Sequence, residues 1–367
     1  KIPFWYNYNT MPAKPNKQAV SLKNRGAAKP SFDSSALVKK LLAEVSERAR
    51  EVLTLRFGLG TASARETLES IGERWSITRE RVRQIEAAAI EAVRASKAFK
   101  DGKPAFDELM LFIEKEGGIL PEDHLLSSLA SDEKARNRFR FLLVVGSSFF
   151  RERETEEFFA RWHVDTATAK KVHAALISLY SSLSDTEVLS ESEVFARFLA
   201  ELKEVDHAYR DEEILKRWLA LSKNISSNPL AEWGRATAPA IRTKGIRDYA
   251  YLVIKREGTP MHFRDVANAI ATLFAKKAHV ATTHNELMKD ERFVLVGRGL
   301  YALAEWGYRP GVVRDVINEI IRKFGPLTRE RVLEEVKKVR YVKDNTILVN
   351  LNDPKHFKRS KTGTYSI

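Results

Sequence analysis

The chain has 367 residues, 44% of them hydrophobic, and is long enough for two to four domains with apolar cores. Its 62 lysines and arginines outnumber its 49 aspartates and glutamates, and this net charge of +13 permits binding to a polyanion. The absence of cysteine excludes disulfides, thiol nucleophiles and cysteine-ligated zinc, and the sequence shows neither a signal-peptide pattern nor an apolar run of about 18 residues, so we expect a cytoplasmic protein that contacts no membrane.

A basic arm is expected at the start of the chain. Residues 1–40 contain eight lysines and arginines against one aspartate, among scattered prolines, serines and asparagines. This composition predicts a flexible arm that adds affinity for phosphates and no sequence specificity. The first ten residues precede the first methionine, Met11, and we assign them no function.

From about Leu41 the spacing of apolar residues becomes helical, and we expect a first folded unit over residues 41–100. Thr67 is a suitable N-cap for a helix over residues 68–75, and Thr78 is a suitable N-cap for the helix that follows. Two helices joined by so short a turn predict a helix-turn-helix.

The second of these helices has two different faces. At about 100° per residue, Arg79, Glu80, Arg83 and Gln84 fall on one side, while Val82 and its apolar neighbours fall on the other. Arginine can bind guanine with two hydrogen bonds, glutamine can do so with adenine, and glutamate can accept from cytosine. Two interpretations remain open from the spacing alone: a helix that reads bases, and an ordinary surface helix with a solvated face.

The run "REVLTLRFGLG…TLESIGERWSITRERVRQIEAAAIEAVR" resembles region 4 of the sigma-70 family of bacterial transcription initiation factors. In that family the helix-turn-helix reads the promoter −35 element, and the domain also docks on the flap of the RNA polymerase β subunit. The resemblance places the base and backbone contacts on Arg79, Glu80, Arg83 and Gln84, and phosphate contacts on Thr78 and Thr67.

The sequence departs from that family in three respects. Ser76 stands where the turn usually has glycine, which costs about 1 kcal/mol if the residue needs a positive φ. The alanines at 87–89 replace a more basic tail, which lowers the expected affinity for the DNA backbone. The residues before position 41 hold no counterpart of the family's promoter-melting region, so we do not expect this chain to open promoters alone.

Residues 104–235 are expected to form a helical middle region. The predicted helices cover 106–115, 122–129, 133–138, 154–162, 168–183, 191–205 and 211–221. The stretch "RFRFLLVVGSSFFRE", residues 138–152, has two apolar runs around a glycine and predicts a β-hairpin or wing. Trp162, Trp218 and Trp233 are expected in the core rather than as base-stacking platforms. This region offers no chemistry.

Residues 240–307 carry a second resemblance. The stretch "GIRDYAYLVIKREGTPMHFRDVANAI…NELMKDERFVLVGRGLYALAEWG" resembles the HARE-type helix-turn-helix, a winged-helix module of the RNA polymerase delta subunit, restriction systems and chromatin proteins. The resemblance depends on Gly258, Pro260, Met261, His262, Phe263, the step 290–293 and the return 299–301. Alternating residues on both sides of Arg298 place this arginine at a hairpin tip, where it either touches DNA or is solvated. His262 is expected to be a cap or core residue, not a metal ligand.

The same pattern recurs in residues 308–367. Alignment pairs Gly311, Pro326, Phe357, Gly363 and Tyr365 with Gly245, Pro260, Phe293, Gly299 and Tyr301. Two tandem winged helices are therefore expected. Lys358, Arg359 and Lys361 surround the second wing and are candidate DNA contacts.

The sequence predicts a mainly α, multi-domain protein of helix-turn-helix and winged-helix modules with short β-hairpin wings. It contains no P-loop, no GxSxG, no HExxH and no metal spacing of histidines, so we expect no catalytic, cofactor or metal site and no small-molecule substrate. The expected partners are double-stranded DNA and, through the resemblance, the β flap of RNA polymerase.

Two other functions remain open at this stage. The region 4-like unit could dock on polymerase as an adaptor that reads no bases. The chain could also be a nucleoid-type protein that binds DNA mainly through charge, which would make its binding steeply salt-dependent. Each of the functions considered fits a cytoplasmic, nucleoid-associated protein.

Overall fold

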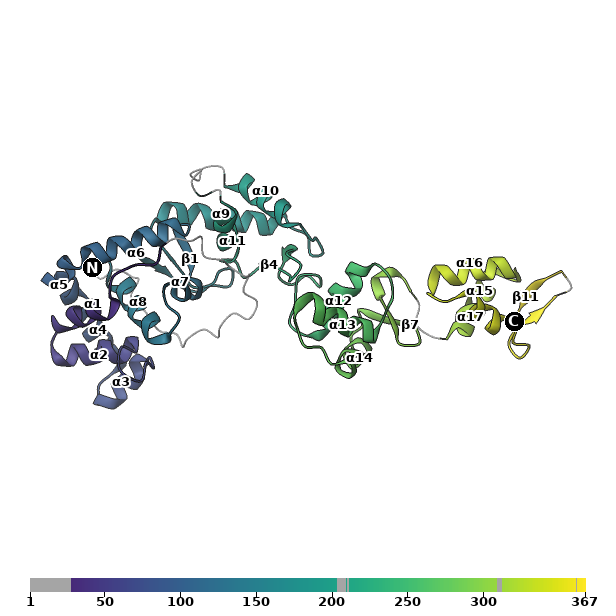
Figure 1. Cartoon of the computed structure of the whole chain (residues 1–367), viewed down its shortest axis with the longest axis horizontal. Helices are drawn as coiled ribbons and strands as arrows, with labels where there is room; N and C mark the ends of the chain where they lie inside the picture. The colour runs from purple at the N-terminus through teal and green to yellow at the C-terminus, as the bar shows by residue number, and fades with distance from the viewer. Residues whose placement is uncertain (1–27, 203–208, 210, 309–311, 361) are drawn as a thin grey trace. The chain divides into compact units, whose positions relative to one another are not determined.

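The computed structural model describes residues 28–202, 209, 211–308, 312–360 and 362–367, and it is mainly α-helical with short antiparallel strands (Figure 1). This confirms the expected fold class. The chain divides into two compact units, Lys1–Ile241 and Arg242–Ile367. Within the described residues, none of the helices has the length and apolar character that crossing a membrane requires.

The first unit begins with a group of helices that includes the helix-turn-helix. They are α1 (Ser34–Ala43), α2 (Glu47–Phe57), α3 (Leu68–Trp75), α4 (Arg79–Ala95) and α5 (Lys97–Asp101). Gly58 ends α2 in the left-handed region with φ 62°, as a helix C-terminus favours. The side chain of Asp33 accepts hydrogen bonds from the backbone N–H groups of Ser35 and Ala36 and so starts α1. The predicted arm over residues 1–40 was therefore wrong for its last residues, and residues 1–27 lie outside the described part.

Four later segments repeat one order of elements: helix, strand, helix, helix, strand, strand. We name them repeat 1 (103–163), repeat 2 (166–235), repeat 3 (246–303) and repeat 4 (313–366). In each, the last strand pairs in antiparallel fashion with both of the other strands. The first strand of repeat 2 is reduced to a single bridge between Leu189 and Trp233. The sequence predicted two of these four segments as repeats.

Repeats 1 and 2 complete the first unit. Repeat 1 consists of α6 (Lys103–Lys115), β1 (Ile119–Pro121), α7 (Glu122–Leu129), α8 (Glu133–Val145), β2 (Phe150–Glu152) and β3 (Arg161–His163). Repeat 2 consists of α9 (Thr166–Ser182), the bridge at Leu189, α10 (Glu191–Glu201), α11 (Glu212–Leu219), β4 (Ile225–Ser227) and β5 (Trp233–Arg235). Trp162, Trp218 and Trp233 are at most 1% exposed, which confirms their predicted place in the core.

Repeats 3 and 4 form the second unit. Repeat 3 consists of α12 (Ile246–Glu257), β6 (Met261–His262), α13 (Phe263–Phe274), α14 (Val280–Lys289), β7 (Phe293–Gly297) and β8 (Leu300–Leu303). Repeat 4 consists of α15 (Val313–Phe324), β9 (Leu327–Thr328), α16 (Arg329–Val339), α17 (Asp344–Leu351), β10 (Lys358–Arg359) and β11 (Thr364–Ser366). The aligned Tyr301 and Tyr365 are both buried, and the aligned Gly299 and Gly363 both have positive φ.

The predicted hairpin over residues 138–152 was wrong in its first half, because α8 continues to Val145. Phe141, Leu142 and Leu143 are fully buried, and the last five residues of this helix, 141–145, are all apolar and buried. Such a helix lacks the one-sided pattern that separates helices from strands in a sequence. The second half does form strand β2, and its partner β3 lies at the end of the region predicted as a helix over 154–162.

The helix α8 joins repeat 1 to the helices that precede it (Figure 1). Arg94 of α4 donates hydrogen bonds to the carbonyl oxygens of Val144 and Val145, both at 2.9 Å. The side-chain amide of Asn137 donates to the carbonyl oxygen of Gly58 at 3.2 Å, and the rings of Phe57 and Phe141 lie 5.4 Å apart. One hydrophobic core therefore runs from α1 into repeat 1, across the boundary expected near residue 100.

Two histidines of the first unit are kept neutral by their surroundings. Burial and the nearby charge of Arg217 lower the pKa of His124 to about 4. Burial and the charge of Arg161 lower the pKa of His173 to about 4, and Arg161 Nε donates to His173 Nε2 at 2.7 Å. Glu152 lies beside His173 and binds Arg161, and its pKa is lowered to about 2, chiefly by a hydrogen bond with His163.

Each of these two histidines should make the first unit less stable in mild acid, by about 2 kcal/mol between pH 7 and pH 5. Their pKa is about 4 in the folded chain and 6.5 when unperturbed, so only the unfolded chain takes up protons in this window, and stability falls as the pH falls. Urea unfolding followed by tryptophan fluorescence at both pH values measures the loss. The double variant His124→Gln, His173→Gln should lose most of this dependence; an unchanged dependence would assign it to other groups.

Candidate nucleic-acid interface

The turn between α3 and α4 is fixed by its backbone. Ser76 lies in the left-handed region, with φ 55° and ψ 39°, and the next N–H, of Ile77, donates to the carbonyl oxygen of Gly72 at 2.9 Å. A side chain at Gly72 would lie 2.6 Å from the carbonyl oxygen of Ile77, so only glycine fits there. The hydroxyl of Thr78 accepts from the N–H of Arg81 at 3.2 Å and starts α4. The turn therefore sets the direction in which α4 leaves α3.

The serine in this turn is under backbone strain, and Ser76→Gly is expected to raise the free energy of unfolding by about 0.5–1 kcal/mol. Glycine has no Cβ and adopts positive φ at no steric cost, although it also gains freedom in the unfolded chain. Thermal or urea unfolding of the full chain measures the change. The matched control is Ser127→Gly, which lies within α7 and should instead lower stability. If the Ser76→Gly variant is less stable than the wild type, the argument that Ser76 is under backbone strain is wrong.

The helix α4 presents the predicted residues on its outer face. Arg79, Glu80 and Gln84 are exposed and Arg83 is half-buried, whereas Val82 on the opposite face is fully buried. The faces expected from the sequence are therefore the faces of the folded helix. The four predicted residues lie in the first two turns of α4, and the N-terminal part of a recognition helix is the part that contacts base edges.

Ion pairs and hydrogen bonds organise this face. Arg83 donates to both carboxylate oxygens of Glu80, at 2.8 and 2.6 Å, and this contact lowers the pKa of Glu80 and raises the pKa of Arg83. Arg81 donates to the side-chain oxygen of Gln84 at 3.2 Å. Within the described residues, the Arg79 side chain makes no hydrogen bond or ion pair, and its charge adds to the lowering of the pKa of Glu80. Arg83 and Gln84 are thus held in place from within the helix, while Arg79 is available to a ligand.

The two threonines singled out by the sequence lie at helix N-termini. The hydroxyl of Thr67 accepts from the N–H of Ser70 at 3.1 Å, as that of Thr78 does from Arg81. Both residues are exposed. An accepting hydroxyl still has its own hydrogen to donate, so both can bind a phosphate oxygen without losing the cap.

The sequence analysis did not single out Glu86, a buried residue that supports the interface. Glu86 is 1% exposed on the inner face of α4, and its carboxylate lies 3.5 Å from Arg56 of α2. Burial raises the pKa of Glu86, and the charge of Arg56 opposes this effect. At 100° per residue Glu86 falls beside Val82, so the sequence could have indicated a buried ion pair through an acidic residue on the apolar face. The pair ties the reading helix to α2.

The predicted wing residues lie in the second unit. Arg298 is exposed at the two-residue tip between β7 and β8, as expected. Lys358 and Arg359 are exposed on β10, and Lys361 lies outside the described residues. His262 caps α13 by accepting from the N–H of Arg264, in agreement with its predicted structural role. The structure thus places the candidate contacts on two separate units.

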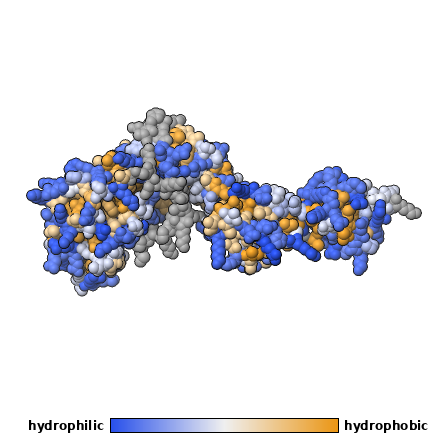
Figure 2. Space-filling view, in the orientation of Figure 1, coloured by the Kyte–Doolittle hydropathy of each residue, from blue (hydrophilic) through white to orange (hydrophobic). Residues whose placement is uncertain are grey.

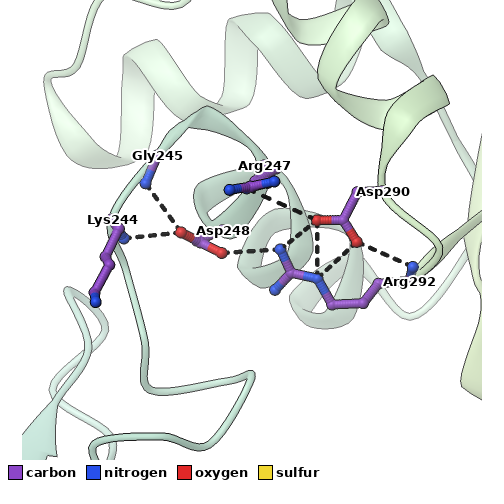
Figure 3. Close-up of polar contacts among 6 residues, drawn as sticks. All are labelled: Lys244, Gly245, Arg247, Asp248, Asp290 and Arg292. Carbon is purple, nitrogen blue, oxygen red and sulfur yellow. Dashed lines mark hydrogen bonds and ion pairs between the residues drawn. The ribbon is translucent and has the colours of Figure 1, made fainter.

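The step at residues 290–293, which carried the second resemblance, is an internal anchor of repeat 3 (Figure 3). Arg292 donates to Asp248 at 2.8 Å and to Asp290 at 2.7 Å, and Asp248 accepts from the backbone N–H of Lys244 and Gly245. These contacts bind the start of α12 to the turn before β7. Arg292 is therefore engaged inside the fold, and the exposed Arg298 is the stronger candidate for a DNA contact.

Side chains that could bind a metal are not grouped in the described part: it contains no cluster of three or more histidine, aspartate or glutamate residues suited to an ion.

Comparison with known proteins identifies part of the chain. Residues 41–95 match the family model for sigma-70, region 4, so the chain carries this domain, and the first resemblance is confirmed. RNA polymerase sigma factor RpoD of Helicobacter pylori is 43% identical over 63 residues, which are 17% of this chain and 9% of the relative. RNA polymerase sigma factor SigA of Clostridium acetobutylicum is 48% identical over 65 residues, 17% of each chain.

A longer alignment reaches SigA of Listeria monocytogenes, 42% identical over 88 residues, 22% of this chain and 23% of the relative. The chain thus spans less than a quarter of the length of these three relatives. The resemblance of residues 240–307 to the HARE-type module stays a prediction.

Proposed function

We propose that this chain is a DNA-binding transcription protein that recognises a promoter −35-like element through α4, and that repeats 3 and 4 are winged helices that add contacts with DNA or RNA polymerase. The observation that carries the proposal is the row of exposed Arg79, Glu80 and Gln84 and half-buried Arg83 on a helix whose other face is packed, within a sigma-70 region 4 domain. Two arginines, an acid and an amide can distinguish guanine, cytosine and adenine in a major groove.

The distribution of charge supports contact with DNA at both ends of the chain. Residues 1–40 carry a net charge of +7, and residues 242–367 carry 25 lysines and arginines against 14 acids, a net charge of +11. Hydrophilic side chains predominate on the visible face of the molecule (Figure 2). Several modest contacts on one chain increase overall affinity through a high effective concentration.

The second candidate is an adaptor that docks on RNA polymerase without reading bases. The relatives are named RNA polymerase sigma factors, and this favours a polymerase partner. In this chain, however, α8 covers the apolar face formed by α1, α2 and α4. An adaptor would have to use the remaining surface of the domain, and this observation ranks the adaptor second.

The test is selection from a randomised duplex pool by the full chain at near-physiological salt, followed by sequencing of the bound DNA. Enrichment of a TTGACA-like element that depends on Arg79 and Arg83 would support the proposal. Absence of any enriched sequence, together with a pull-down of core polymerase that survives Arg79→Ala and Arg83→Ala, would replace it with the adaptor.

A further inference from the structure

The four repeats use their third helix in two different ways. In repeats 1 and 2 this helix is part of a core: α8 packs against α1, α2 and α4, and α11 contains the fully buried Arg217 and Trp218. In repeat 3 only Thr283 and Leu287 of α14 are buried. In repeat 4 only Ile347 and Leu351 of α17 are buried. Repeats 3 and 4 therefore leave their third helix open on one side.

Net charge separates the repeats in the same way. Residues 104–241, which contain repeats 1 and 2, have 17 lysines and arginines against 24 acids, a net charge of −7, whereas residues 311–367, with repeat 4, have 13 against 7, a net charge of +6. A polyanion is repelled by the first set and attracted by the second. Charge and exposure thus both select the C-terminal part as the one that meets DNA.

The open face of α17 consists of neutral groups that can contact bases. Asn345 and Val349 are four residues apart, opposite the buried Ile347, and Val349 is 67% exposed. Thr346 lies next to them and is also exposed. Within the described part of the chain, the side chains of Asn345 and Thr346 make no hydrogen bond. An amide, a hydroxyl and an apolar group therefore face solvent together.

Positive charge lies at the N-terminus of this helix and on the wing of the same repeat. Lys343 is the N-cap residue of α17, and Lys358 and Arg359 are exposed on β10 of the same repeat. The one acid in the first turn of α17, Asp344, is paired with Lys337 at 2.5 Å. Cations and a neutral row in one repeat suit DNA, where phosphates accompany the base edges.

The helix α16 is the alternative within the repeat, since residues 328–332 repeat the sequence Thr-Arg-Glu-Arg-Val of residues 78–82. Its arginine Arg331 is paired with Glu334 at 2.7 Å and with Glu335 at 2.9 Å. Three acids on this helix offset most of its positive charge. The side chains of Asn345 and Thr346 on α17 make no such contacts, so α17 is the better candidate for a helix that contacts bases.

We propose that α17 is a second sequence-reading helix, which binds double-stranded DNA in the major groove and prefers A·T pairs through Asn345, Thr346 and Val349. Asparagine can bind the N6 and N7 atoms of adenine with two hydrogen bonds, and the methyl groups of valine and threonine fit the methyl group of thymine. This site rests on the DNA contact proposed above for repeat 4 and names the helix and the base pairs involved, but it is separate from α4 and can be tested apart from it.

The experiment is duplex-pool selection with three forms of the full chain: wild type, the triple variant Asn345→Ala, Thr346→Ala, Val349→Ala, and Arg79→Ala, Arg83→Ala. All three residues of the triple variant are exposed, so the fold should be retained, and circular dichroism checks this. The matched control is Ile177→Ala on α9, an exposed aliphatic residue in the acidic part of the chain.

The wild type should select two elements, one of them A·T-rich. The triple variant should lose the A·T-rich element alone and bind a duplex carrying it about 10- to 100-fold more weakly. The arginine variant should lose only the other element, so that failure of α4 and failure of α17 give different results. A triple variant that selects the same sequences as the wild type overturns the proposal, as does an element assigned to α17 that contains only G·C pairs.

Discussion

Alanine at both Arg79 and Arg83 is expected to reduce the discrimination between the selected duplex and a duplex with altered bases by about 2–6 kcal/mol. An arginine that binds guanine with two hydrogen bonds contributes about 1–3 kcal/mol of discrimination, and Arg83→Ala alone should account for that amount. The guanidinium of Arg83 is already oriented by two hydrogen bonds to Glu80, so little ordering is left to occur on binding. Competition binding at fixed salt measures the difference.

The control for this experiment removes the same charge elsewhere. Arg153 and Arg197 are exposed in the acidic part of the first unit, and their double alanine variant should weaken binding to all duplexes only slightly. If Arg79→Ala, Arg83→Ala instead weakens the selected and the altered duplex equally, both arginines contact phosphates and α4 does not read bases.

Loss of the carboxylate in Glu116→Ala is expected to lower the free energy of unfolding of the first unit by about 3–5 kcal/mol. Glu116 follows α6 and is fully buried, and its side chain binds the fully buried Arg217 of α11 at 3.0 Å. The variant would leave a charged guanidinium in the core without its partner carboxylate, which is the costly way to break a buried pair. Urea unfolding of the full chain measures the effect.

The companion variant removes both charges. Glu116→Ala combined with Arg217→Met replaces the guanidinium with an apolar side chain and should recover much of the lost stability. A single variant that loses less than about 1 kcal/mol would contradict the argument, because that is the size expected of a solvated pair. Failure of the double variant to recover would assign the loss to altered packing between repeats 1 and 2.

The sequence predicted the helix-turn-helix better than it predicted the scaffold. The bounds of α3 and the first residue of α4 agree with the expected ones, because Thr67 and Thr78 are N-caps and each helix has one apolar face. These signals are local and lie in the residues themselves. Whether Arg79 and Arg83 touch DNA stays a prediction, since contact depends on a partner.

The scaffold was harder to predict because its signals are not local. The last five residues of α8, 141–145, are apolar and buried on all sides because two groups of helices share this helix, and such a run resembles a buried strand in the sequence. The strands of repeats 1 and 2 are three residues long, and one is a single bridge at Leu189, too short for a visible alternation. Repeats 3 and 4 were found because they share glycine, phenylalanine and tyrosine at matching positions.

Because α4 is anchored on α8, the orientation of α4 on a DNA duplex would also fix the direction in which the rest of the first unit extends. Arg94 of α4 binds the end of α8, Asn137 of α8 binds Gly58 after α2, and the hydrophobic core is continuous, so α4 and repeat 1 are packed as one body. Once α4 lies in a groove in one orientation, the acidic repeats must leave the DNA in one direction only. If the DNA site is inverted, these repeats extend in the opposite direction along the duplex. The orientation of the site would therefore decide on which side of it the DNA stays accessible to a neighbouring protein.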